Sequence, residues 1–263
     1  MLGAWTHRLI RRLAARRLRT GPGIVQTDFF GCQMLVRPKE DVGRSMALGE
    51  FETEDLRHFM DAIQDGDLVF DIGANVGAYC VPVARALPHA RIFAFEPIAL
   101  NAALIQVSLL MNRLSGVQIV RKCVSSESGM VEFSLAEDSA YSSMIDTRRK
   151  SEVETLQCAA VSLDDFCRDE RCGIPDVVKI DVEGAELKVL HGSANVFSSA
   201  RNRPRLVLME LYDQNLSVFG TSIDEVTGHM RNWGYRPYVL LNGSKVPFER
   251  HHHNKHYNVF FAV

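Results

Sequence analysis

The sequence predicts an α/β protein built on one doubly wound, mostly parallel sheet. Short apolar runs alternate with helical patterns along the chain, as they do where helices cover both faces of such a sheet. Four of these apolar runs end in an acidic residue. The length of 263 residues, with 46% hydrophobic and 24% charged residues, suits one domain of this class with an extension.

Charge is distributed unevenly along the chain. Residues 1–20 contain six arginines and no acid, which leaves 24 basic and 32 acidic residues, a net charge of −8, for the remainder. This acidic body argues against nucleic-acid binding. The six cysteines lack the spacing of a zinc site, so we expect reduced thiols in a cytoplasmic protein. No apolar run approaches the roughly 20 residues that span a bilayer.

Residues 1–48 are expected to form an N-terminal extension of a domain that covers residues 49–263. Residues 2–19 have the pattern of a basic amphipathic helix, without the apolar core of a secretion signal. Such a helix can pack on the domain, join a second subunit in an oligomer, or make peripheral contact with an anionic membrane, and the sequence leaves these alternatives open. Two short strands, near 24–26 and 34–36, are expected in a lead-in segment that covers the site.

The domain is expected to start with a helix over 53–64, with Thr53 as its N-cap. A buried strand, a tight turn and a second helix follow around residues 68–84. The turn has the spacing G-x-N-x-G instead of the G-x-G-x-x-G of a dinucleotide site. Asp71 precedes it by two residues, where an acid would repel a pyrophosphate and attract a cation. S-adenosylmethionine, which carries an ammonium and a sulfonium but no phosphate, therefore fits this turn.

The second strand, 91–95, is followed by Glu96, in the position where an acid binds ribose hydroxyls. An insertion over 124–160 is expected to contain strands at 130–135 and 158–161. The other expected elements are a helix over 99–113 with Leu104, Val107, Leu110 and Met111 on its apolar face, a strand at 117–120, a helix from Ser162, a strand at 176–181, a helix ended by Gly192, a strand at 205–210, a helix over 222–233 and two closing strands near 235–241 and 257–263.

The acids that end the four apolar runs are Asp71, Glu96, Asp181 and Glu210. Because the carboxyl ends of parallel strands share one edge of a sheet, and ligands bind at that edge, we expect the four acids to converge. Four acids at one edge suit a cationic cofactor and a hydroxyl-rich acceptor.

Over roughly residues 49–263 the chain resembles the FkbM family of S-adenosylmethionine-dependent methyltransferases. The matching segments are Phe70–Gly77, Phe95-Glu96-Pro97 with Asn101, Val178–Glu186 and Leu208-Met209-Glu210. The resemblance implies a Rossmann-like, seven-stranded methyltransferase sheet whose last strand is antiparallel. It also implies transfer of a methyl group from S-adenosylmethionine to a hydroxyl of a sugar, a glycolipid or another small natural product.

The resemblance further implies roles for individual residues. Asp71, Gly73, Asn75 and Gly77 would surround the methionine part of the cofactor, and Glu96 would bind the ribose hydroxyls. Asn101 would hold the local turn or approach the edge of the cofactor. Cys123, Val124, Ser142 and Ser143 would border the adenine.

Methyl transfer to an alcohol needs a general base, because the hydroxyl proton must leave as the new bond forms. Glu183 is the first choice for this base, since it follows the fourth strand where acceptors dock. Glu210 is the second choice, as base or acceptor clamp, and Asp181 is expected to orient cofactor or acceptor. Lys179, inside the strand, is expected to pair with an acid.

Three other interpretations were weighed. The histidines at 251–253 and His256 could bind a metal, but we expect a solvated loop and no metal, because O-methylation here needs none. A nicotinamide oxidoreductase is disfavoured because Asn75 breaks the dinucleotide pattern. A non-catalytic scaffold that recruits partners through its basic helix remains the alternative function.

Overall fold

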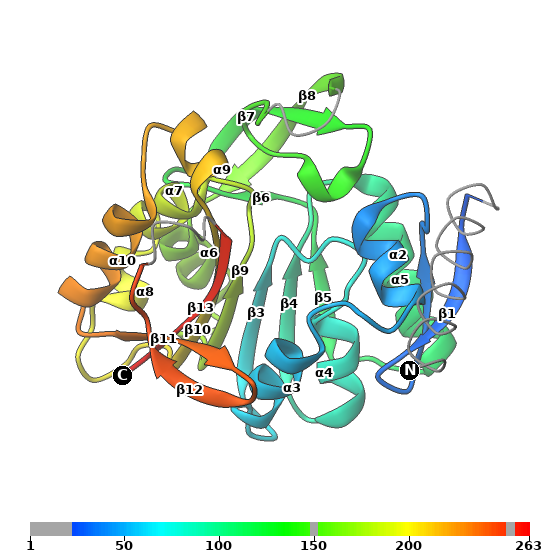
Figure 1. Ribbon diagram of the computed structural model, residues 1–263, viewed down its shortest axis with the longest axis horizontal. Helices are drawn as coiled ribbons and strands as arrows, with labels where there is room; N and C mark the ends of the chain where they lie inside the picture. The colour runs from blue at the N-terminus through cyan, green and yellow to red at the C-terminus, as the bar shows by residue number, and fades with distance from the viewer. Residues whose placement is uncertain (1–22, 148–151, 251–255) are drawn as a thin grey trace, which may run out of the picture.

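Eight strands form the central sheet of the computed structural model, which describes residues 23–147, 152–250 and 256–263. Across the sheet the strands follow the order β12 (Ser244–Pro247), β11 (Arg236–Leu241), β13 (His256–Ala262), β10 (Leu206–Tyr212), β9 (Val177–Ile180), β3 (Leu68–Ile72), β4 (Arg91–Phe95) and β5 (Val117–Val120). Strands β10, β9, β3, β4 and β5 are parallel, whereas β13 is antiparallel to both of its neighbours. The seven expected strands and the antiparallel last strand are confirmed, and β12 adds an eighth strand at the edge (Figure 1).

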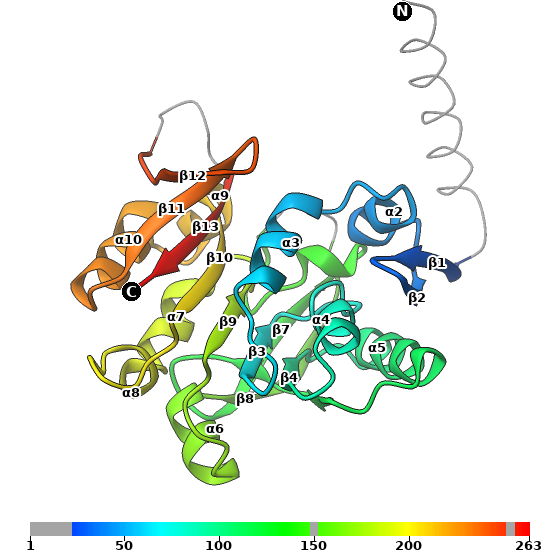
Figure 2. The same ribbon diagram turned by 90° about the horizontal axis from the view of Figure 1, so that it is seen from below.

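Helices cover both faces of this sheet, as Figure 2 shows. One face carries α3 (Thr53–Asp61), α4 (Cys80–Ala86) and α5 (Ala99–Asn112), and the other carries α6 (Leu163–Glu170), α7 (Glu186–His191), α8 (Ala194–Phe197), α9 (Asp213–Val218) and α10 (Ile223–Asn232). Successive strand side chains alternate between two cores: Phe70 and Ile72 belong to one, and Val69 to the other. Within the described part of the chain, no helix combines the length and apolar character needed to cross a membrane.

The lead-in segment forms a hairpin that is fixed to α5. Its strands are β1 (Val25–Phe29) and β2 (Cys32–Val36), and α2 (Asp41–Ala47) follows them. The N–H of Gln33 donates to Asn112 Oδ1 over 2.9 Å, and the N–H of Leu35 donates to Ser108 Oγ over 3.0 Å. The two expected strands are therefore present, while the domain boundary at residue 48 stays a prediction.

The insertion forms a separate sheet at the top of Figure 1, above β3 and β4. Its strands lie in the order β6 (Cys123–Val124), β8 (Glu152–Val161) and β7 (Gly129–Ala136). Strand β8 is much longer than the predicted 158–161, because it pairs with β7 along nearly the whole length of β7. A short 3-10 helix, Ser139–Tyr141, follows β7 and approaches the carboxyl edge of the central sheet.

Several predicted element boundaries were wrong. Helix α4 begins only at Cys80, so Val76 lies in the preceding turn. Thr53 is the first residue of α3, and the cap position belongs to Glu52, which has a left-handed backbone. The cap at Ser162 is confirmed, since its Oγ accepts the N–H of Asp165 over 3.1 Å. All six cysteines are free thiols. The predicted helix over 2–19 and the histidines at 251–253 lie outside the described residues.

The predicted apolar face of α5 was confirmed for Leu104, which is 4% exposed, and wrong for the other three residues. Val107 and Leu110 are 40% and 65% exposed, and Met111 is exposed beside them, while Leu109 is only 2% exposed. Ten of the fourteen side chains of this helix are apolar and they lie on all sides of it, so its periodicity could not select the buried face. The polar Ser108 is buried because it accepts a hydrogen bond from the β1–β2 hairpin.

Adjacent leucines of α5 test this orientation. We expect Leu109→Ala to lower the free energy of unfolding by about 2–5 kcal/mol, because it opens a cavity in the core. Leu110→Ala should change it by no more than about 0.5 kcal/mol, because that side chain is in solvent. Urea unfolding of the two variants beside the wild type measures both effects. Equal losses, or a larger loss for Leu110→Ala, would show that α5 presents its other face to the sheet.

Candidate active site

The turn after β3 is joined to the two neighbouring strands by its backbone. The N–H groups of Gly73 and Ala74 both donate to the carbonyl of Phe95, each over 3.0 Å. Gly73 has a φ of +77°, and a Cβ on it would lie 1.8 Å from the carbonyl oxygen of Asp181. Only glycine fits there, because the turn passes directly against the end of β9. The predicted G-x-N-x-G turn therefore sits where β3, β4 and β9 meet.

Asp71 lies beneath this turn and not at its surface. Its Oδ2 accepts the N–H of Cys80 over 3.1 Å, which holds the first turn of α4, and its Oδ1 lies 3.7 Å from the Lys179 ammonium. Asp71 borders neither of the two cavities described below. The cation that balances this carboxylate is therefore Lys179, whereas the sequence had suggested a cationic ligand.

Lys179 connects the turn to the acid at the end of β9. Its residue lies directly opposite Asp71 in the parallel pairing of β3 and β9. The ammonium donates to the Gly73 carbonyl over 2.8 Å and to Asp181 Oδ2 over 3.1 Å, and it lies 5.5 Å from the centre of the Tyr79 ring. Burial opposes the charged form, but the carboxylates of Asp181 and Asp71 outweigh burial and raise the pKa of Lys179. The predicted pairing of Lys179 with an acid is confirmed.

Glu96 anchors the turn from the other side. Its Oε2 accepts the N–H of Asn75 over 2.8 Å, and its Oε1 accepts the N–H of Ile98 over 2.8 Å and the Asn101 amide over 3.3 Å. The residue is only 4% exposed, and burial raises the pKa of Glu96 to about 8 against the effect of these donors. Asn101 is itself held by the Arg37 guanidinium, whose Nη2 donates to Asn101 Oδ1 over 2.7 Å.

An apolar cavity opens in front of Glu96. Its apolar lining comes from both sheets, and the members are Ile72, Phe95, Ile98, Val124, Phe133 and Met144. Cys123 and Ser142 border it as the sequence suggested, whereas Ser143 does not. The Oδ1 atom of Asn75 is buried and has no hydrogen-bond partner among the described residues, although Asn75 borders the cavity. A cavity with an apolar slot, a carboxyl group and an unused acceptor fits a nucleoside with a cationic tail.

A second, acidic cavity of about 270 Å³ adjoins the first. Gly73, Asn75, Asp181 and Glu183 border both cavities. The lead-in segment and the insertion contribute to its wall, as expected. Its carboxyl groups belong to Asp41, Glu52, Asp181, Glu183 and Glu210, its cationic or titratable nitrogens to Lys179 and His256, and its phenols to Tyr79 and Tyr141.

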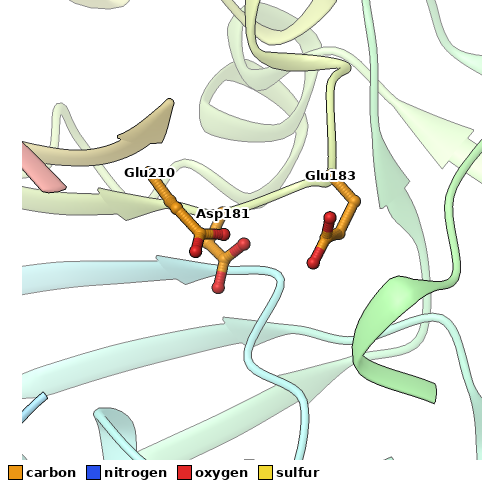
Figure 3. A group of neighbouring side chains, drawn as sticks. All are labelled: Asp181, Glu183 and Glu210. Carbon is orange, nitrogen blue, oxygen red and sulfur yellow. The ribbon is translucent and has the colours of Figure 1, made fainter. Parts of the chain in front are cut away.

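Three of these acids converge at the junction of the cavities (Figure 3). The nearest oxygens of Asp181, Glu183 and Glu210 all lie within 4.8 Å of one another. Glu183 has a φ of +55° and accepts a hydrogen bond from the Asn215 amide. Each acid has a polar protein partner: Lys179 contacts Asp181, Asn215 contacts Glu183, and His256 contacts Glu210. The predicted convergence of strand-end acids is realised for Asp181 and Glu210, together with Glu183.

The pKa values of Asp181 and Glu210 are shifted in opposite directions. Burial would raise the pKa of Asp181, but the Lys179 ammonium and a hydrogen bond from Glu210 lower it. Burial and the Asp181 charge raise the pKa of Glu210 well above its usual value. Asp181 is therefore the charged partner and Glu210 the protonated one.

Sequence reasoning missed several residues of the acidic cavity. The Tyr79 hydroxyl donates to Glu52 Oε2 over 2.6 Å, and the Tyr141 hydroxyl donates to Asp41 Oδ2 over 2.6 Å. His256 was expected in a solvated loop, which was wrong: it begins β13, and its Nε2 lies 2.6 Å from Glu210 Oε1. Tyr79 lies in the turn after β3 but has no acid or glycine signature, and the other residues do not follow a strand of the parallel sheet, so no local pattern marked them.

Besides Asp71, two more of the predicted cofactor residues lie behind the cavity walls. Gly77 faces Val81 and Ile105, which a Cβ on it would approach within 3.0 and 3.2 Å, so it serves helix packing. Asn101 borders neither cavity and acts through Glu96. Gly73, Asn75 and Glu96 do border the apolar cavity, and their contact with a cofactor stays a prediction.

Comparison with known proteins places this arrangement among methyltransferases. A family model described as the methyltransferase FkbM domain matches residues 71–237. The hexuronic acid methyltransferase AglP of Haloferax volcanii is 26% identical over 214 residues, covering 78% of this chain and 83% of the relative. The 31-O-demethyl-FK506 methyltransferase FkbM of Streptomyces tacrolimicus is 24% identical over 208 residues, covering 68% and 76%.

Solved structures agree on the fold. A protein of Streptococcus mutans assigned as a SAM-dependent methyltransferase superimposes with a TM-score of 0.50 at 11% identity. The match covers 92% of this chain and 56% of that chain. At this identity the likeness concerns the Rossmann-like fold alone.

Proposed function

The chain belongs to the FkbM methyltransferase family, and from this premise we propose that it transfers a methyl group from S-adenosylmethionine to a hydroxyl group of a sugar, a glycolipid or another small natural product. The observation that carries the proposal is the pair of adjoining cavities, one apolar with Glu96 and one acidic, which share Gly73, Asn75, Asp181 and Glu183. A methyl donor bound in one cavity and a methyl acceptor bound in the other would meet at these shared residues.

The apolar cavity supports cofactor binding. Glu96 is placed to accept ribose hydroxyls, and Ile98, Phe133 and Met144 offer an apolar slot for a base. The unused Asn75 Oδ1 and the carboxylate of Asp181 suit a cationic tail. S-adenosylmethionine, when bound, supplies an activated methyl group at a sulfonium.

The acidic cavity supports a hydroxyl acceptor. Its described lining carries five carboxyl groups against one ammonium and one imidazole, a balance that disfavours a free carboxylate or phosphate as acceptor. The name of the AglP relative includes a hexuronic acid, so charge is a point on which this chain is expected to differ. Hydroxyl groups, in contrast, can donate to these carboxylates.

Glu183 is the proposed general base. It borders both cavities, and it accepts a hydrogen bond from the neutral Asn215 amide. The Lys179 ammonium contacts Asp181 and makes that carboxylate a weaker base, and Glu210 holds a proton already. Glu183 can therefore take the acceptor proton, while the shared turn aligns donor and acceptor, which supplies much of the rate.

Calorimetry with S-adenosylhomocysteine tests the cofactor site and its pH dependence. Ribose hydroxyls donate to a carboxylate, but Glu96 has a pKa of about 8 and is mostly protonated below that pH. We expect the affinity to rise as the pH increases from 6 to 8, by up to about tenfold per unit, and then to level off. Glu96→Gln should bind more weakly and lose this slope.

NAD, which we expect not to bind, is the control ligand in the same titration. Failure of the folded wild type to bind S-adenosylhomocysteine would remove the cofactor assignment. Tight binding with no slope in the wild type would show instead that Glu96 is ionised throughout this range.

An acceptor screen tests the transfer itself. Wild-type protein and S-adenosylmethionine are mixed with neutral methyl glycosides, glycolipids and free uronic acids, and S-adenosylhomocysteine formation is measured. We expect turnover with hydroxyl acceptors in preference to the uronic acids. Glu183→Gln should reduce the rate by about 10²–10⁴-fold, because the base is lost, and leave cofactor affinity nearly unchanged.

Glu127→Gln is the control, because this exposed acid of the insertion borders neither cavity. A wild-type rate for Glu183→Gln would assign the base elsewhere. Good cofactor binding without transfer to any acceptor would favour the scaffold function.

A further inference from the structure

If the protein methylates a hydroxyl group, as proposed above, the proton of that hydroxyl must leave the acidic cavity. Methylation of a hydroxyl releases one proton per turnover, because the O–H bond breaks as the C–O bond forms. The cavity already holds five carboxyl groups, so a proton that stayed there would neutralise the base for the next turnover. Repeated turnover therefore needs a way for the proton to pass from the junction of the cavities to solvent.

Asp181 and Glu210 form the first part of such a path. They come from the adjacent parallel strands β9 and β10, and Figure 3 shows their carboxyl groups side by side. Their nearest oxygens lie within 4.8 Å of each other, and repulsion between two negative charges at this distance favours one proton on the pair. The opposite directions of their pKa shifts agree with a proton that sits on Glu210 and is shared with Asp181.

His256 forms the second part. It lies on β13, which is antiparallel to β10, and its Nε2 is 2.6 Å from Glu210 Oε1. The imidazole side chain is 50% exposed, whereas the side chains of Asp181 and Glu210 are 28% and 19% exposed. Histidine is the side chain whose usual pKa allows it to accept and release a proton near neutral pH.

The three residues are arranged in the order that a path requires. Asp181 borders both cavities, whereas Glu210 and His256 border only the acidic one. Glu183, the proposed base, has an oxygen within 4.8 Å of both carboxyl groups, a gap that one water or a second hydroxyl of the acceptor spans. The series Glu183, Asp181, Glu210 and His256 thus leads from the reaction centre to a half-exposed imidazole.

We propose that Asp181 and Glu210 share one proton and that His256 carries the proton released in each turnover from this pair to solvent. The O–H of Glu210 turns from Asp181 to Nε2 of a neutral His256 that carries its own proton on Nδ1, and Glu210 transfers its proton to Nε2. The proton that arrives at Asp181 then moves onto Glu210. The imidazolium releases its Nδ1 proton to water and regains the first tautomer by exchange with solvent. Each carboxyl group and the imidazole return to their starting state, so no other reactant is consumed. His256 does not touch the reacting atoms and acts through Glu210.

The charges around the pair favour retention of its proton. Glu52 and Glu183 face Glu210 from the start of α3 and from the loop after β9, and both raise the pKa of Glu210. Lys179 opposes them at Asp181, to which it donates over 3.1 Å. The Tyr212 ring lies 5.5 Å from the imidazole of His256.

Two variants of His256 separate proton transfer from hydrogen bonding. Gln in place of His256 keeps an N–H near Glu210 but cannot carry a proton, whereas Ala leaves space for free imidazole. With the best hydroxyl acceptor from the screen, His256→Gln and His256→Ala should both slow methyl transfer by about 10²-fold, with unchanged affinity for S-adenosylhomocysteine. Added imidazole should restore the rate of His256→Ala and not that of His256→Gln.

An infrared measurement tests the shared proton without any acceptor. In the full-length protein with S-adenosylhomocysteine at pH 7, the difference spectrum between wild type and Glu210→Gln should contain one protonated-carboxyl band. His256→Gln should keep this band, and calorimetry with S-adenosylhomocysteine confirms that each variant is folded.

The outcomes are distinct. A wild-type rate for His256→Gln, or a slow His256→Ala that imidazole does not restore, would overturn the role of His256. A difference spectrum without the band would overturn the shared proton. Absence of methyl transfer by the wild type, with the band present, would count against the proposed function and leave the shared proton in place.

Discussion

The buried ammonium of Lys179 is the interaction on which the rest of this site depends. It contacts Asp71, the Gly73 carbonyl and Asp181, and so it joins the support of α4, the glycine turn and the acid at the end of β9. Asp71 and Lys179 can be buried beside the partly exposed Asp181 only when their charges and hydrogen bonds compensate the lost hydration. Removal of the ammonium would leave two acids without their cation beneath the two cavities.

The position of Lys179 also divides the acids by function. The ammonium lowers the pKa of Asp181, and it opposes the rise that burial causes in the pKa of Asp71, whereas the pKa of Glu210, one strand further away, is raised by burial and by the Asp181 charge. Glu183 takes its hydrogen bond from an amide instead. Burial and the position of one cation among similar carboxyl groups together give them different proton affinities.

The parts of the site that local sequence could predict are those that follow parallel strands. Asp181 and Glu210 were expected to meet, since the geometry of a parallel sheet brings strand ends to one edge, and they do. Asp71 follows the same rule in sequence, yet the pleat turns it into the core, and cross-strand pairing with Lys179 decides its partner. Glu52, Tyr79 and His256 reach the acidic cavity through long-range packing, which no local spacing encodes. The same limit explains α5, where a helix apolar on all sides carries no information about its buried face.

The measurement that tests this account most directly is calorimetric titration of Lys179→Met with S-adenosylhomocysteine, beside urea unfolding of the same variant. Lys188→Met, at an exposed position of α7, is the matched control. We expect Lys179→Met to lower the free energy of unfolding by about 3–5 kcal/mol, because it leaves buried carboxylates uncompensated. Adding Asp71→Asn should recover part of this stability, because it removes a carboxylate that has lost its cation. The affinity of this double variant for S-adenosylhomocysteine should stay at least about tenfold weaker than that of the wild type, because the Gly73 carbonyl has lost its hydrogen-bond donor. A Lys179→Met protein that binds S-adenosylhomocysteine like the wild type would contradict the account.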